Sequence, residues 1–332
     1  MKTIRARVSA VHRDVLHLHN SESEIVATLS NSLFRSGQNS HDPFARPTVG
    51  DWIIAESPDS AHYRVIAVEP RTSTLVRRSP GSDHAPQLLA ANVDTAFIFS
   101  PFPEGPNVRR LARLVSLALA GNIIPVVVLS RIDTVPPEVV SEATHAIASY
   151  LPDVSVVATS TTSDGGLFAI NPWLWLGATI VLLGPSGAGK STMLNALAGA
   201  SLMETGATRR DGAGRHTTTH RAMIELPSGL FVIDTPGLRE VGVWASAEAN
   251  DMLFHDIAAL AADCRFADCN HDQEPGCAVR AALRDGVVAS ARWEQWQELR
   301  REAAFLERSQ SERRRRERQG SLAMRRVLKN RP

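Results

Sequence analysis

A glycine-rich loop, GPSGAGKS, lies between the apolar run ATIVLL and the segment STMLNALAGA. It matches the pattern G-x-x-x-x-G-K-[ST], which is specific when a strand precedes it and a helix follows it, and both are expected here. Glycines let the backbone turn its N–H groups inwards around phosphates, and the helix N-terminus adds positive potential. A chance glycine-rich turn would lack that context. The chain therefore carries a nucleotide-binding loop, hereafter the phosphate loop, on an α/β fold.

Side-chain chemistry assigns roles within and after the phosphate loop. Lys190 would reach the β- and γ-phosphates and assist catalysis, and the Ser191 hydroxyl would bind Mg²⁺. Asp234 begins DTPG at the end of a predicted strand, from which it would hold Mg²⁺ through water while the Gly237 N–H senses the γ-phosphate. Alone, D-x-x-G also describes a common turn, but its place after the phosphate loop favours the nucleotide role. The expected contacts of the loop itself are Gly184, Pro185, Ser186, Gly187, Ala188, Gly189, Lys190, Ser191 and Thr192.

Between these two motifs lies the polar stretch RRDGAGRHTTTH, residues 209–220. It has no apolar periodicity, two glycines and three successive threonines. This suits a switch segment that supplies a threonine hydroxyl to Mg²⁺ only when the γ-phosphate is present. Thr219 is the first candidate for that catalytic and metal-binding role, and Thr218 is the second. An ordinary polar loop is the alternative interpretation.

Two further patterns concern the base of the nucleotide. SRID, residues 130–133, follows the buried strand PVVVL, and the carboxylate of Asp133 could accept from guanine N1–H and N2–H₂ together. The pattern resembles the N-K-x-D motif of GTPases, with Ile132 at its free position. Ser130 and Arg131 replace the usual Asn and Lys, which weakens recognition of the other base edge. ATST follows the next predicted strand, and Ser160 lies in this loop, whose backbone would support the guanine.

Both base-reading patterns precede the phosphate loop, whereas ordinary GTPases carry them after D-x-x-G. Circular permutation preserves a sheet when the old termini lie close together. This order resembles that of the ribosome small subunit-dependent GTPase A (RsgA) family. The segments QLLAANVD, GPSGAGKST, RHTTT and DTPGL and the cysteine block, described next, also resemble that family. The resemblance covers nearly the whole chain.

Three cysteines are the only ones in the chain, and they fall in one short window with a histidine: Cys264, Cys269, His271 and Cys277. Three thiolates and an imidazole form a closed tetrahedral set, which is typical of structural Zn²⁺ sites. Three buried free cysteines beside a surface histidine are the alternative. The flanking residues are polar, so the loop would have little reason to fold without a metal. The odd number of cysteines also argues against a disulfide framework.

The resemblance implies a domain order and an activity. It implies an OB-like barrel at residues 1–78, a circularly permuted α/β GTPase domain at 85–243, and a helical zinc-binding domain with a basic tail at 244–332. The activity would be hydrolysis of GTP to GDP and phosphate during late maturation of the small (30S) ribosomal subunit, stimulated by that subunit. The expected partners are GTP or GDP, the small subunit and its 16S rRNA, and we expect a monomer.

Hydrophobic periodicity supports this domain order. Short strands are expected at Ile4–Val11, Val15–His19, Glu24–Leu29, Asp51–Glu56 and Tyr63–Glu69. Five short strands favour an OB-like barrel, although an SH3-like barrel fits the same periodicity. After about residue 91, apolar strands alternate with helices, which indicates a parallel sheet covered on both faces. Helices are expected at Val108–Ala120 and Pro137–Tyr150, from the phosphate loop through Ala200, and from Ala291 onwards.

The charge of the chain is distributed unevenly. From Arg300 to the end there are twelve Lys and Arg residues against four Glu, although the net charge of the whole chain is only +1. Four consecutive arginines, residues 313–316, favour RNA phosphate contact over a merely solvated helix end. No apolar run approaches the roughly 20 residues needed to span a bilayer, and the N-terminus does not resemble a secretory signal. We therefore expect a cytoplasmic protein that does not bind membranes.

The residue after DTPG is Leu238, where many GTPases carry a glutamine that orients the attacking water. Leucine cannot hold a water, so slow turnover without a partner is expected. His216 is the nearest chemically suitable side chain in sequence, and a neutral imidazole could accept a hydrogen bond from water. A solvent-exposed loop histidine is the alternative. Two other functions remain open: an ATP-dependent P-loop enzyme, and an RNA-binding assembly factor whose nucleotide site only binds.

Overall fold

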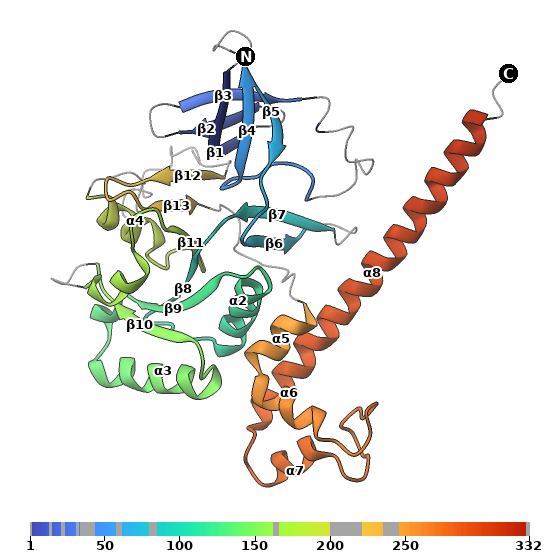
Figure 1. Ribbon diagram of the computed structural model, residues 1–332. Coiled ribbons are helices and arrows are strands. Elements are labelled where there is room, and N and C mark those ends of the chain that lie inside the picture. Colours follow the sequence, from blue (N-terminus) through green and yellow to red (C-terminus); the bar gives the residue numbers. More distant parts are fainter. Residues whose placement is uncertain are drawn as a thin grey trace, which may run out of the picture. The chain divides into compact units, whose positions relative to one another are not determined.

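A computed structural model describes residues 2–12, 15–20, 24–30, 33, 44–57, 62–79, 85–161, 166–199, 221–234 and 246–329. Within the last helix, side chains are described as far as Ser309 and at Arg315. The chain divides into two compact units, shown in Figure 1. The first comprises residues 1–77 and 87–243, and the second comprises residues 78–86 and 244–332. Each unit is described by itself below.

The N-terminal strands of the first unit close into a five-stranded barrel. The strands are β1 (Lys2–His12), β2 (Val15–His19), β3 (Glu24–Leu29), β4 (Trp52–Ser57) and β5 (Tyr63–Val68). They pair in the order β1-β2-β3-β5-β4, and β4 returns to pair with β1. Val8, Leu18 and Ile53 are among the side chains that fill the interior. The predicted barrel is confirmed, and the parallel β3–β5 pairing agrees with its OB-like form.

A small sheet that the sequence analysis missed follows the barrel. It consists of β6 (Thr74–Arg78) and β7 (Pro86–Ala91). Neither strand alternates apolar and polar residues, because TLVRR ends in two arginines and PQLLAA ends in four buried residues. Period-two patterning therefore gave no signal for this pair.

A mostly parallel sheet forms the rest of the first unit. Its strands lie in the order β10-β9-β8-β11-β13-β12, and β12 also pairs with β1 of the barrel through Ala10 and Ala222. Helix α2 packs on β8 and β9, and α3 packs on β10 (Figure 1). Residues of β8, β9 and β11 are almost entirely buried, as expected for a covered parallel sheet. The elements are β8 (Thr95–Pro101), α2 (Val108–Ala120), β9 (Ile124–Ser130), α3 (Pro137–Tyr150), β10 (Ser155–Thr159), β11 (Thr179–Leu183), α4 (Lys190–Ala198), β12 (Ala222–Glu225) and β13 (Phe231–Asp234).

The strand order places a ligand site at one edge of this sheet. The chain runs outwards from β8 to β9 and β10, then returns to β11 on the other side of β8. Crevices at such a reversal, beyond the carboxyl ends of the strands, are the usual ligand sites of open α/β sheets. The helix after the phosphate loop ends earlier than predicted, because α4 ends at Ala198 rather than Ala200. Gly199 adopts φ 65°, and a left-handed glycine ends a helix.

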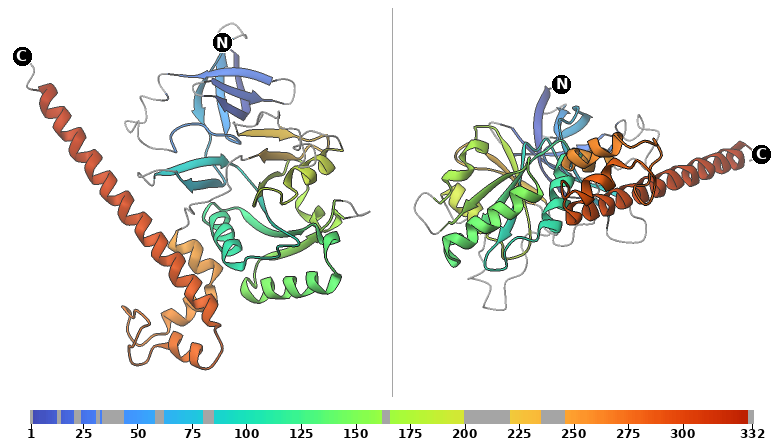
Figure 2. Two further views of the ribbon diagram at one scale, coloured as in Figure 1. Left: turned by 180° about the vertical axis from the view of Figure 1, so that it is seen from behind. Right: turned by 90° about the horizontal axis from the view of Figure 1, so that it is seen from below.

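The second unit is helical, as predicted. It contains α5 (Ala247–Leu253), α6 (His255–Ala262), α7 (Ala278–Arg284) and the 40-residue α8 (Ser290–Lys329), which Figure 2 shows as one continuous helix. Trp296 Nε1 donates to Asp251 Oδ1 on α5 (3.0 Å), and Arg292 pairs with Asp256 on α6. These contacts fix the first turns of α8 against the shorter helices. Among the described helices, none has both the length and the apolar character required to cross a membrane.

Candidate functional site

The phosphate loop leaves β11 and enters α4, as its sequence predicts. Gly184 adopts φ 141°, and a Cβ there would lie 2.9 Å from both Cβ and the carbonyl oxygen of Phe99, so only glycine fits. Gly187 and Gly189 also have positive φ values, of 78° and 87°, which side chains rarely adopt. Lys190 Nζ donates to the Gly184 carbonyl (2.9 Å) and the Pro185 carbonyl (2.6 Å). The ammonium group is thereby held across the loop, where phosphate charge would be neutralised.

The two base-reading patterns meet at the ends of adjacent strands. Strands β9 and β10 are parallel with Ser130 opposite Thr159, so the loops that follow them lie side by side. Ser160 Oγ donates to Asp133 Oδ1 at 2.7 Å. Ser160 is buried whereas Asp133 is exposed, so a buried hydroxyl orients an accessible carboxylate. Arg131 is exposed and adopts the left-handed conformation, with φ 59°, at the turn between Ser130 and Asp133.

Ser130 also contacts the phosphate loop. Its hydroxyl donates to the carbonyl of Ala188 at 2.8 Å, and this bond is buried. The contact connects the base-reading strand to the loop that would hold the phosphates. Sequence reasoning missed it, because no local pattern marks a bond between residues so far apart in the chain.

The proposed magnesium ligands come from the same edge of the sheet. Asp234 is the last residue of β13, which runs parallel to β11, and Ser191 lies in the first turn of α4. Both therefore stand near the carboxyl ends of neighbouring strands. His216, Thr218, Thr219, Gly237 and Leu238 lie outside the described residues, and their roles stay predictions.

The cysteine window brings its four predicted ligands together in the second unit. The ligand atoms of Cys264, Cys269, His271 and Cys277 all lie within 4.8 Å of one another. Sγ of Cys264 is 3.8 Å from Sγ of Cys277, and these two sulfurs lie 3.4 Å and 3.5 Å from Nδ1 of His271. The residues present thus fit a closed Cys₃His metal site.

Two features organise the loop that carries these ligands. Glu274 accepts from the backbone N–H groups of Asn270, Asp272 and Gln273 at 2.8–3.1 Å. The bond from its own backbone N–H, followed by these three, lowers the pKa of the Glu274 carboxyl to about 2. His271 packs edge-on against Trp293, with the ring centroids 5.5 Å apart. Burial lowers the pKa of His271, which favours the neutral, metal-binding imidazole.

These features define the class of the protein. The phosphate loop, the strand that ends at Asp234 and the SRID and ATST segments lie at one edge of a parallel sheet, and SRID and ATST come first in the chain. That arrangement is a circularly permuted P-loop GTPase domain, here with an N-terminal barrel and a helical C-terminal unit that carries a Cys₃His cluster able to hold a metal ion.

Comparisons with known proteins give the family. A sequence model described as RsgA GTPase matches residues 68–244. A relative from Opitutus terrae, named small ribosomal subunit biogenesis GTPase RsgA, is 41% identical over 317 residues, covering 91% of this chain and 84% of its own. A relative of the same name from Methanosarcina acetivorans is 36% identical, covering 91% and 80%. The chain belongs to the RsgA GTPase family.

Solved structures agree at the level of the fold. The crystal structure of YjeQ from Thermotoga maritima aligns with TM-score 0.66 and 22% identity, covering 91% of this chain and 99% of that one. YloQ, described as a circularly permuted GTPase, aligns with TM-score 0.63 and 23% identity, covering 91% and 96%. The permuted fold predicted from motif order is confirmed.

Proposed function

We propose that this GTPase acts in the late maturation of the small (30S) ribosomal subunit and that the subunit stimulates its hydrolysis of GTP. Curated relatives that match 91% of the chain are named small ribosomal subunit biogenesis GTPases. The bond from Ser160 to Asp133 carries the nucleotide assignment, because it orients a carboxylate beside the phosphate loop. A carboxylate in that place suits the two donors of guanine and repels the N1 lone pair of adenine.

We infer the nucleotide contacts from this geometry together with the motifs. Ser130, Arg131, Ile132, Asp133 and Ser160 would surround the base, and the phosphate loop with Thr192 would surround the phosphates. Mg²⁺ would be held by Ser191 and Asp234, together with Thr219, and the ion supplies charge neutralisation at the γ-phosphate. Gly237 would contact the same phosphate through its N–H group.

For the Cys₃His site we propose structural Zn²⁺. An ion about 2.3 Å from sulfur and about 2.0–2.1 Å from nitrogen, with tetrahedral geometry, separates its ligands by about 3.5–3.8 Å. The separations among the ligand atoms of Cys264, His271 and Cys277 are 3.4–3.8 Å and agree with this, and all four ligand atoms lie within 4.8 Å of one another. No open ligand position is needed, since four protein ligands complete the tetrahedron.

The partner would be 16S rRNA within the small subunit. Twelve basic residues follow residue 299, and α8 carries most of them on one helix. The barrel is a second candidate surface, because closed five-stranded barrels of this kind bind nucleic acids through one face. A monomeric, cytoplasmic protein would suit a factor that joins and leaves an assembling subunit.

Phosphate release tests the proposal directly. Multiple-turnover release from GTP should be slow for the protein alone and should rise on addition of small subunits, but not of large subunits. Excess GTP, but not excess ATP, should compete with labelled GTP. Equal competition by ATP would favour an ATP-dependent P-loop enzyme, and binding without turnover would favour an assembly factor that does not hydrolyse.

The proposed water-orienting residue has a separate test. His216→Ala should keep GTP affinity and lose about 100-fold or more of the stimulated turnover, because the residue acts only in the transition state. His220→Ala, four residues along the same polar stretch, is the matched control and should stay close to wild type. Full stimulated activity in His216→Ala would exclude the histidine from the chemistry.

A further inference from the structure

A short loop of the barrel, residues 48–51, lies against the GTPase sheet; we call it the joint loop. Gly50 N–H donates to the Val8 carbonyl on β1 (2.8 Å), and the Val49 carbonyl accepts from Ala91 N–H on β7 (2.9 Å). Gly50 adopts φ 89°, and a Cβ there would lie 2.1 Å from the Ala91 carbonyl oxygen and 3.3 Å from Cδ1 of Ile233. The joint loop is therefore closely packed against Ile233 of β13, the residue before Asp234.

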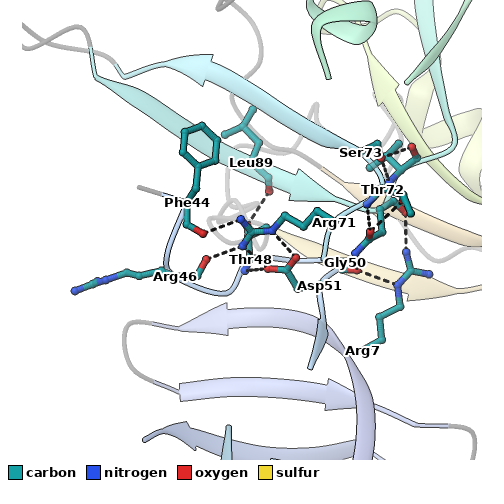
Figure 3. A network of polar contacts seen from close by, with 12 residues as sticks. Arg7, Phe44, Arg46, Thr48, Gly50, Asp51, Arg71, Thr72, Ser73 and Leu89 are labelled. Atoms are coloured by element: carbon teal, nitrogen blue, oxygen red, sulfur yellow. Dashed lines mark hydrogen bonds and ion pairs between the residues drawn. The ribbon is translucent and has the colours of Figure 1, made fainter. Parts of the chain in front are cut away.

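Arg7 on β1 holds the joint loop in this position (Figure 3). Its Nε donates to the Gly50 carbonyl (3.2 Å), and its Nη2 donates to the Asn92 carbonyl (2.9 Å). Its guanidinium carbon also lies 5.0 Å from the ring centroid of Phe231, the first residue of β13. One side chain of the barrel thus binds the joint loop, the segment before β8, and the strand that ends at Asp234.

Burial does not neutralise this arginine. Only 4% of Arg7 is exposed, and burial lowers its pKa to about 10, while Asp94 and Asp51 act in the opposite direction. The guanidinium therefore stays charged at neutral pH, where charge-assisted bonds to two carbonyls are strong and directional.

The other end of the joint loop is fixed to the barrel surface. The carboxylate of Asp51 is fully buried, accepts from Thr48 N–H (2.8 Å), and binds Arg71 through both oxygens at 2.7 Å and 2.8 Å. Arg71 also donates to the carbonyls of Phe44 and Arg46 (2.7 Å and 3.0 Å), and both of these residues are exposed (Figure 3). An aromatic ring and a guanidinium group suit stacking on unpaired bases. Residues 44–51 therefore extend from an accessible surface of the barrel to β13.

The β12–β13 hairpin has further contacts on the same side. Ala222 pairs with Ala10 of β1, and His19 Nε2 lies 2.7 Å from Glu225 Oε2. Arg221 donates to the Leu88 carbonyl of β7 (3.1 Å). The hairpin that presents Asp234 is thus bound along its outer edge by the barrel and β7.

We propose that the joint loop transmits RNA binding at the barrel to the nucleotide site, with Arg7 as the positioning residue. The proposal rests on the proposed function, because it supplies the route by which a subunit would stimulate hydrolysis. A displacement of residues 44–51 on RNA binding would move β13 with it, because close-packed contacts shift as units rather than deform. Asp234 would then be placed for catalysis only in the bound state.

The test compares two arginines of the same strand. Arg7→Lys keeps the charge but loses the two-point attachment to Gly50 and Asn92. Subunit-stimulated kcat should fall about 5- to 100-fold, the range of ordinary coupling between sites, while the KM for subunits, the GTP affinity and the basal turnover change less than about twofold. Arg5→Lys is the matched control, because Arg5 stacks on Trp52 and pairs with Glu69 within the barrel; it should behave as wild type.

A second variant approaches the same contact from the sheet. Phe231→Leu removes the ring beside the Arg7 guanidinium and should also lower the subunit-stimulated kcat. In the double variant with Arg7→Lys, the two losses should be less than additive, because the two residues are in contact. Equal loss of basal turnover would make Arg7 merely structural and overturn the inference, as would full stimulation of both variants. Absence of stimulation in the wild type would instead overturn the proposed function, and this inference with it.

Discussion

The candidate nucleotide site draws its residues from segments between Ser130 and Gly237, whereas the Cys₃His cluster draws all four ligands from the stretch between Cys264 and Cys277. The SRID loop and the phosphate loop follow β9 and β11, most of whose side chains are buried, so the sheet fixes the positions of these loops. In residues 264–277, hereafter the metal loop, only Cys277 is buried, and the other three ligands are partly exposed. A site built on a sheet can exist before its ligand binds, whereas a site with so little core depends on its metal for order.

Metal removal is the strongest test of this difference. Chelation at neutral pH should abolish the order of residues 264–277 and loosen α6 and α7, because metal binding at structural sites contributes about 10–16 kcal/mol of folding free energy. Amide hydrogen exchange should rise in those segments and stay low in β8, β9 and β11. Cys269→Ser should give the same pattern without chelator. Unchanged exchange in the metal loop would mean that its order does not depend on the ion.

The two regions were predictable from sequence for different reasons. The cysteine window is local, so ligand type and spacing were enough to select all four residues that the structure brings together. The candidate nucleotide site is spread along the chain, but SRID, ATST and DTPG were each expected at the end of a strand, and the structure brings these strand ends to one edge of the sheet. In both cases a short pattern carried the chemistry.

Contacts between distant segments had no such signal. The bond from Ser130 to Ala188 and the attachment of Arg7 to Gly50 and Asn92 join residues that no periodicity relates. Arg7 looks like an outward polar residue in an alternating strand, yet it is buried because the GTPase sheet covers that face of the barrel. Packing between domains decides its environment, and single-sequence patterns report only on local structure.

Base recognition provides the next largest effect. Asp133→Asn should weaken GTP binding by about 1.5–3 kcal/mol, roughly 10- to 150-fold, because the variant loses the charged carboxylate that accepts hydrogen bonds from guanine. The amide should improve the binding of xanthosine triphosphate (XTP), because the xanthine edge is complementary to it. The change in the ratio of GTP to XTP affinity should therefore be larger than the loss of GTP affinity alone. Competition binding with GTP, XTP and ATP measures both. Because the sheet holds the site, far-ultraviolet circular dichroism should not change. Equal GTP and XTP affinities in variant and wild type would remove Asp133 from the base site.

The smallest expected effect distinguishes two roles for Ser130. If its hydroxyl mainly positions the phosphate loop through Ala188, Ser130→Ala should weaken the binding of GTP, GDP and XTP alike. The expected loss is about 0.5–1.5 kcal/mol, roughly 2- to 10-fold, the usual range for one neutral hydrogen bond. The lost bond leaves the buried Ala188 carbonyl without this donor, so the loop rather than the base pocket is disturbed. Ser130→Thr keeps the hydroxyl and should restore most of the affinity.

The alternative is that Ser130 reads the base, as its place in the N-K-x-D-like pattern suggests. In that case the loss in Ser130→Ala would be confined to guanine nucleotides, and affinity for inorganic triphosphate would not change. A preorganised site predicts the opposite result, because a strand that fixes the phosphate loop acts on every ligand that the loop binds. Titration of the variant with triphosphate alone therefore separates the two roles without reference to turnover or to the subunit.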